Sequence, residues 1–239
     1  MEATQQKMTL EDVSHIFHAR EFAYDVLRRF FIEEPSREYL KPFIYQNMID
    51  LFPFQEESES IKEGIQEIKH YCSAADPVNS NEDYDSLHWD YTKMFIGPFD
   101  IEVLPYESTY VTKDKLIFQG TTLAVRYIYG KFAYQSADHM EADDHIGLEL
   151  DFMFHLNQLC IESCNPANPN ALAEVQYLLH EQHTFLDKHI SRFVDELSDG
   201  IIAHADTAFY KGLAKILQGF ITIDLKVLNE LLNIQLEKN

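Results

Sequence analysis

The run IGLELDFMFHLNQLCI, residues 146–161, decides the fold together with the acidic residues just before it. The run is strongly apolar. Asp143 or Asp144 stands where a carboxylate can accept hydrogen bonds from the free N–H groups of a first helical turn. We therefore expect a helix over residues 146–161 that begins at one of these two aspartates.

Apolar residues recur at helical spacing in other parts of the chain as well. Residues 114–134 are ambiguous, because their Val, Ile, Thr and Tyr favour a strand. A helix is preferred there because no second strand of comparable strength could pair with it. The first predicted helix is carried by Val13, Ile16, Phe17, Ala23, Tyr24, Leu27 and Phe31, and further helices are expected over residues 38–51, 58–71, 171–197, 206–220 and 222–236.

Glycine and proline are sparse, with eight of each in 239 residues, which indicates long helices rather than many short strands. We predict an all-α fold, a single compact multi-helix bundle that forms one domain. The polar residues 74–86 are predicted to be a mobile loop. The acidic residues 136–144 are the best candidate for a hinge between N-terminal helices, about 1–135, and C-terminal helices, 145–239.

The chain is acidic, with 40 Asp and Glu against 19 Lys and Arg and a formal net charge of −21. This charge repels phosphate, so no nucleic-acid partner is expected, and it favours cationic partners. The alternative is an acidic surface that only keeps the protein soluble. Three cysteines do not make a disulfide framework, and no signal peptide or membrane span is visible, so we expect a cytoplasmic protein without stable membrane insertion.

Patterns of known catalytic centres are missing from the sequence. No glycine forms GxGxxG, a phosphate loop or GxSxG. Among the eleven histidines, His180 and His183 are one residue too close for the zinc pattern HExxH, and Glu67 with His70 supplies only one of the two ExxH pairs of a di-iron bundle. We expect no catalytic residues, no metal and no cofactor. The alternative is a metal-binding helical-bundle enzyme that uses these His- and Glu-rich helices.

Two segments carry side chains suited to binding. Residues 91–98 and 104–110 place aromatic and apolar groups on a proline-stiffened connection, where large side chains tend to bind a partner. Residues 141–153 place carboxylates and an imidazole at the start of a helix, directly after the hinge. A packed loop and an ordinary helix cap explain these features equally well when they are taken alone.

Taken together, the two segments resemble the TorD/DmsD family of redox-enzyme maturation (twin-arginine signal-binding) chaperones. The family pattern YxxLFxGP…PPWESVY is similar to Tyr91, Met94, Phe95, Gly97 and Pro98, followed by Pro105, Tyr106, Glu107, Ser108 and Tyr110. The pattern ExPDHxxxELxFM is similar to Glu141, Asp144, His145, Glu149, Leu150, Phe152 and Met153, and a later family feature is similar to Phe185, Leu186, His189 and Phe193. The chain departs from the family pattern at two places. Ala142 and Asp143 stand between Glu141 and Asp144, where the family has a proline, and Tyr106 stands where the family has tryptophan.

The resemblance implies a cytoplasmic system-specific chaperone, not an enzyme. Such a protein binds the twin-arginine signal peptide, and the apo-form, of a molybdenum-cofactor oxidoreductase subunit, assisting cofactor insertion and delaying export. An assembly chaperone of a non-exported oxidoreductase is the alternative within the family. A monomer or a domain-swapped dimer is expected, with the residues 136–144 as the hinge of the swap.

The resemblance also implies one peptide groove lined by both segments. Glu107, Glu141 and Asp144 are expected to pair with the arginines of the signal, because carboxylates bind guanidinium groups in bidentate geometry. Aromatic and apolar side chains are expected to receive the apolar part of the signal, while Ser108 lies in the same matched segment and His145 either tunes the site near neutral pH or orients Asp144. The apolar set is Met94, Phe95, Pro105, Tyr106 and Tyr110.

Overall fold

The computed structural model describes residues 7–97, 101–135, 141–165 and 167–238, and helices dominate it. This confirms the predicted all-α fold. The helices are α1 (Leu10–Ile32), α2 (Arg37–Tyr45), α3 (Glu59–Ala74), α4 (Asn81–Tyr91), α5 (Glu107–Val111), α6 (Gly120–Lys131), α7 (Ile146–Ser163), α8 (Ala171–Lys188), α9 (Val194–His204) and α10 (Ala208–Asn233). Short 3-10 turns cover Met48–Leu51, Gln55–Glu57 and Ile190–Arg192, and a π-helical turn covers Thr92–Ile96.

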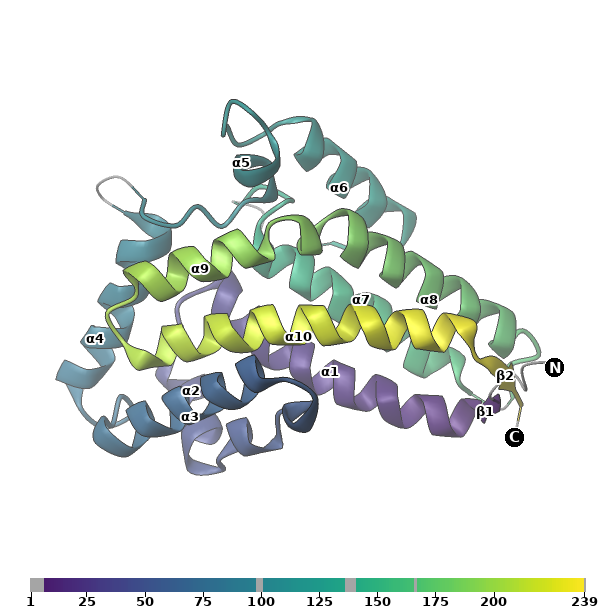
Figure 1. The fold of residues 1–239 in the computed structure, drawn as a ribbon, viewed down its shortest axis with the longest axis horizontal. Coiled ribbons are helices and arrows are strands. Elements are labelled where there is room, and N and C mark those ends of the chain that lie inside the picture. Colours follow the sequence, from purple (N-terminus) through teal and green to yellow (C-terminus); the bar gives the residue numbers. More distant parts are fainter. Residues whose placement is uncertain (1–6, 98–100, 136–140, 166, 239) are drawn as a thin grey trace.

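Helix α10 is the central element of the bundle. It packs along α3 and also contacts α8 and α9, while α1 packs along α7. Figure 1 shows α10 running the length of the molecule, with α8 and α9 on one side and α3 on the other. Near the termini, the short strands β1 (Lys7–Thr9) and β2 (Gln235–Glu237) pair in parallel. Within the described residues, no helix is both long enough and apolar enough to cross a lipid bilayer.

Two glycines allow α3 and α10 to pack closely. A Cβ atom at Gly64 would lie 2.5 Å from the carbonyl oxygen of Gly212, and a Cβ at Gly212 would lie 2.5 Å from the carbonyl oxygen of Gly64. Any side chain at either position would therefore push the two helices apart. The pair explains why the longest helix of the bundle and α3 can share such an extensive interface.

A buried ion pair connects α1 with α7 and α10. Nε of Arg20 donates to Asp224 Oδ1 at 2.5 Å, and Nη1 of Arg20 donates to Asn157 Oδ1 at 2.7 Å. The Tyr24 hydroxyl also donates to Asp224. Burial, the larger cause, and the negative charge of Asp224, the next, raise the pKa of Tyr24 well above its usual value. All four side chains are fully buried, so each depends on the others for its polar contacts.

Several sequence predictions of element boundaries are wrong for identifiable local reasons. The predicted loop 74–86 ends early, because Ser80 Oγ accepts a hydrogen bond from the N–H of Asp83 and starts α4 at Asn81. The predicted helix 114–134 is confined to α6, because Lys115 and Phe118 adopt positive φ angles of 49° and 59° that no α-helix contains.

The C-terminal helices also differ from the predictions. The predicted helix 171–197 is interrupted at His189, whose backbone leaves helical geometry as its side chain contacts Glu107. The predicted helices 206–220 and 222–236 form the single helix α10, and Gly219 within it allows close packing against α3. A Cβ at Gly219 would lie 2.8 Å from the side chain of Ile61 on α3.

The Arg20–Asp224 pair gives a direct test of the packing. Asp224→Asn leaves the buried guanidinium of Arg20 without a counter-charge, and we expect the free energy of unfolding to fall by about 3–5 kcal/mol in urea denaturation. Asp206→Asn, which breaks the exposed pair between Lys93 and Asp206, is the control. It should cost less than about 1 kcal/mol. Equal losses in the two variants would contradict this account of the core.

Candidate functional site

The two segments that suggest binding meet at one backbone pairing, which we call the junction (residues 105–108 and 144–146). The N–H of Glu107 donates to the carbonyl of Asp144 at 2.9 Å, and the N–H of Ile146 donates to the carbonyl of Pro105 at 2.7 Å. Tyr106 and His145 thereby form an antiparallel bridge. The fold thus brings the two segments together, and a peptide groove lined by both stays a prediction.

Asp144 and His145 each stabilise the start of a helix at the junction. Oδ2 of the fully buried Asp144 accepts from the N–H of Ser108, in the first turn of α5, at 2.9 Å. Asp143 or Asp144 was expected to cap α7, but the cap is His145, whose Nδ1 accepts from the N–H of Gly147 at 3.1 Å. Gly147 lets α7 begin against the end of α1, since a Cβ there would lie 2.6 Å from the backbone of Ile32.

The partly exposed rim of the junction consists of Tyr106, Tyr110 and Glu141. The Tyr106 hydroxyl donates to Glu141 Oε2 at 2.5 Å. Its ring lies edge-on to the imidazole of His145, with 5.4 Å between the ring centroids. Tyr110 packs against Phe193, with 5.6 Å between the ring centroids. Aromatic surface and a carboxylate are therefore side by side at this rim.

A cluster of three carboxylates, Glu107, Asp144 and Glu149, lies beneath the junction, and all three are fully buried. Nδ1 of His189 lies 2.9 Å from Glu107 Oε2, and the exposed Arg192 approaches Glu107 Oε1 at 3.8 Å. Burial, then the charge of Glu107, then that of Asp144, raise the pKa of Glu149 well above its ordinary value. The cluster therefore places three acidic side chains where water does not reach, and Glu149 favours its protonated form there.

The other residues predicted to line the groove are buried. Met94 and Phe95 lie in the hydrophobic core, where the Phe95 ring packs against Tyr91 with 5.0 Å between centroids. Pro105 and Ser108 are buried at the junction itself. Contact of these four side chains with a peptide stays a prediction, and it would require a change in local packing. Residues 136–140 of the predicted hinge lie outside the described residues.

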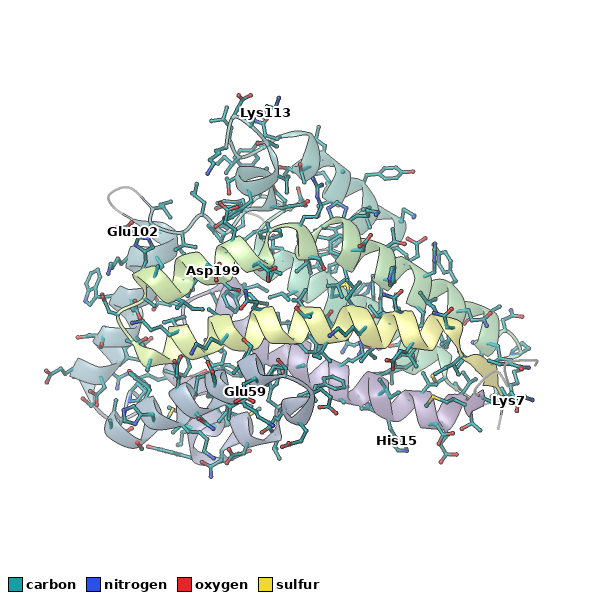
Figure 2. The ribbon with its side chains drawn as sticks, viewed as in Figure 1. Lys7, His15, Glu59, Glu102, Lys113 and Asp199 are labelled. Carbon is teal, nitrogen blue, oxygen red and sulfur yellow. The ribbon has the colours of Figure 1, made fainter. Side chains whose placement is uncertain are left out.

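The histidine pairs considered in the sequence do not gather metal-ligating groups. Within the described ranges, the one group of three such side chains is Glu107, Glu149 and His189, with ligand atoms all within 4.8 Å of one another. His15 lies exposed on the outer side of α1 (Figure 2). Sequence reasoning placed none of Glu149, His189 and Arg192 in the site. A polar Glu149 inside a strongly apolar helix was the available signal for the first of them.

An exposed apolar segment, residues 116–127, follows the junction. Leu116 is 57% exposed, Phe118 is 64% exposed and Tyr127 is 74% exposed, and Ile117 and Leu123 are exposed as well. Figure 2 shows Lys113, which leads into this segment, at the outer tip of the chain between α5 and α6. Exposed apolar groups gathered in this way are typical of a surface that contacts another protein.

A cavity of about 490 Å³ lies elsewhere, between α1 and the C-terminal end of α10. Its walls include Met8, Ile16, Phe54 and Val227, and none of its lining residues belongs to the junction. Its polar lining residues are Asn229, Glu230 and Asn233, and no histidine lines it. The junction remains the better candidate for a recognition site.

Comparison with known proteins places the chain in a family. The sequence model described as nitrate reductase delta subunit matches residues 55–199, which is more than half of the 239 residues and includes the junction. The chain belongs to this family. The membership confirms the resemblance to the TorD/DmsD chaperones, which are system-specific chaperones and not enzymes.

Individual relatives agree with the family assignment. The chain is 23% identical to the chaperone protein TorD of Aliivibrio salmonicida (strain LFI1238) over 205 residues, covering 84% of this chain and 91% of the relative. It is 26% identical to TorD of Aliivibrio fischeri over 153 residues, which cover 63% of this chain and 68% of the relative. It is 24% identical to TorD of Vibrio cholerae serotype O1 (strain ATCC 39315 / El Tor Inaba N16961) over 168 residues, which cover 69% of this chain and 73% of the relative.

The raised pKa of Glu149 predicts how stability varies with pH in buffer that contains a chelator. The usual pKa of a glutamate side chain is 4.5. Between this pH and its raised pKa, Glu149 stays protonated in the folded chain but ionises in the unfolded chain. Stability therefore falls as pH rises, by up to about 1.4 kcal/mol per pH unit, until the folded-state pKa is reached.

Glu149→Gln removes this contribution, so its free energy of unfolding should fall less steeply with pH than that of the wild type. Urea denaturation at a series of pH values measures the difference. The exposed Glu38→Gln removes the same charge and should keep the wild-type slope. If the free energy of unfolding of Glu149→Gln varied with pH as steeply as that of the wild type and of Glu38→Gln, Glu149 would be ionised in the folded chain.

Proposed function

We propose that this chaperone acts in the cytoplasm and binds the twin-arginine signal peptide, and the apo-form, of a molybdenum-cofactor oxidoreductase subunit. It would assist cofactor insertion and delay export of the client until insertion is complete. The observation that carries the proposal is the rim of the junction, where Tyr106 donates a hydrogen bond to the partly exposed Glu141. Family membership supports the same role.

The rim suits the arginine pair of such a signal. Glu141 is the carboxylate of the predicted set that is partly exposed, and the Tyr106 hydroxyl fixes its orientation, leaving acceptor capacity for a guanidinium. Glu107 and Asp144 are fully buried, so they contribute negative potential rather than a surface contact. The net charge of −21 attracts a basic peptide from a distance at low salt.

The apolar part of the signal has two receptors on the chain. The rings of Tyr106 and Tyr110 stand beside the carboxylate, and the exposed apolar segment 116–127 begins a few residues further along. Because a twin-arginine signal carries its basic residues before its apolar stretch, a receptor needs carboxylates and apolar surface in succession. The junction and the segment that follows α5 supply them in that order.

Calorimetric titration tests the proposal directly. The ligands are signal peptides of molybdenum-enzyme subunits encoded beside the gene of this chain, each with an Arg-Arg→Lys-Lys version as control. We expect dissociation constants on the order of micromolar or tighter, weakened in the controls because lysine cannot bind a carboxylate in bidentate geometry. Absence of binding to every signal would contradict export-signal recognition and favour a client that is not exported.

Variants at the rim assign the contact residues. Tyr106→Ala should weaken peptide binding by roughly 1–3 kcal/mol if its ring anchors the peptide, and Tyr106→Phe should show what the hydroxyl contributes to orienting Glu141. Glu141→Gln should weaken binding more at low salt than at high salt. Tyr45→Ala and Glu38→Gln are the matched controls, since both residues are exposed and lie outside the junction. Wild-type affinity in folded Tyr106 and Glu141 variants would place the arginines elsewhere.

A further inference from the structure

Three metal-ligating side chains converge from three separate elements beneath the junction. Glu107 lies at the start of α5, Glu149 lies in α7, and His189 follows the end of α8. Their ligand atoms all lie within 4.8 Å of one another, and His189 Nδ1 lies 2.9 Å from Glu107 Oε2. Such spacing fits neighbouring ligands around one ion, because metal–ligand bonds to nitrogen and oxygen are about 2.0–2.2 Å long.

The carboxylate of Glu149 has no hydrogen-bond partner that suits its ionised form. The side chain is fully buried, and neither of its oxygens accepts a hydrogen bond from any described residue. Oε1 of Glu107 is also buried without a hydrogen bond. The neighbouring Glu107 can accept a hydrogen bond from Glu149 only if Glu149 carries a proton. Buried carboxylates of this kind are normally paired or coordinate a metal.

The charges around the cluster would be balanced by a divalent cation. Metal binding displaces the proton of Glu149, so that Glu107, Asp144 and Glu149 then carry three negative charges in one buried region. Arg192 supplies one positive charge at 3.8 Å from Glu107. No other Lys or Arg side chain is paired with these carboxylates among the described ion pairs. When His189 is neutral, as a metal ligand must be, two negative charges remain unbalanced. One divalent ion balances them.

We propose that Glu107, Glu149 and His189 bind one divalent transition-metal ion. One imidazole and two carboxylates suit zinc, manganese or iron(II), whereas calcium and magnesium prefer oxygen ligands alone. The site is closed to solvent and joins the beginning of α5 to α7 and α8, so the ion stabilises the junction rather than carrying out a reaction. The inference does not depend on recognition of a signal peptide.

The site could not be predicted from the sequence, because its three residues do not recur at helical spacing. Glu107 and His189 are 82 positions apart along the chain. The fold brings them together through the pairing of the junction and through the break after α8. The histidine pairs at helical spacing, such as His180 and His183, do not take part in a group of this kind within the described ranges.

Titration with metal ions alone tests the proposal on the full chain. The protein is treated with a chelator, dialysed, and titrated with zinc chloride or manganese chloride in a calorimeter, while a parallel thermal melt follows its stability. We expect one ion per chain with a dissociation constant on the order of micromolar or tighter, together with a rise in melting temperature.

Matched variants separate this site from the acidic surface, which can bind ions weakly. Glu149→Gln and His189→Gln should each weaken the single strong site by at least about 100-fold and abolish the rise in melting temperature, since losing a direct ligand costs more than losing an outer partner. His180→Gln with His183→Gln is the control and should change neither. Circular dichroism confirms that the variants are folded. Absence of a strong site in the wild type, or a strong site that survives in folded Glu149→Gln and His189→Gln, would overturn the proposal.

Discussion

The backbone pairing between residues 105–107 and 144–146 is the constraint on which the functional part of the structure depends. Two N–H groups and two carbonyls, from positions about forty residues apart in sequence, hold the two matched segments together. From this pairing the side chains of Tyr106 and Glu107 diverge. Tyr106 reaches the partly exposed Glu141 at the rim, and Glu107 enters the buried cluster with Glu149. A single short bridge therefore positions both the surface site and the group of ligands below it.

Burial divides the acidic residues of the site into two classes with different physical roles. Glu141 keeps contact with solvent, so it can exchange water for a guanidinium at modest cost. Glu107, Asp144 and Glu149 have lost their water, and each needs a proton, a hydrogen-bond donor or a cation near it. Asp144 obtains the N–H of Ser108. Glu149 obtains no such donor, which makes it the most informative side chain of the site.

Much of the fold could be predicted from the sequence, because local patterns determine it. The apolar periodicity of residues 13–31 and the run 146–161 correspond to α1 and α7, whose apolar faces are properties of neighbouring residues. The cap of α7 was not predicted, because Asp144 accepts a hydrogen bond from the first turn of α5 instead. Prediction was wrong where tertiary contacts decide. The two helices predicted over residues 206–220 and 222–236 form the one helix α10, and the chain leaves helical geometry at His189 where its side chain meets Glu107.

The candidate site was predicted in part for the same reason. The matched motifs identified the segments that meet, but exposure depends on the whole bundle. Met94 and Phe95 belong to the core, although their types suit a greasy groove equally well. Glu149 and His189 stand in matched motifs, yet only the folded chain shows that they face the same buried space as Glu107.

Hydrogen exchange of the full chain, with and without a bound twin-arginine signal peptide, tests the central claim most directly. If the junction is the recognition site, the peptide should slow exchange in residues 101–112 and 141–148 and in the apolar segment 116–127. Protection that is confined to the cavity between α1 and the end of α10, around Met8, Ile16 and Val227, would contradict the account and move recognition to the other end of the bundle.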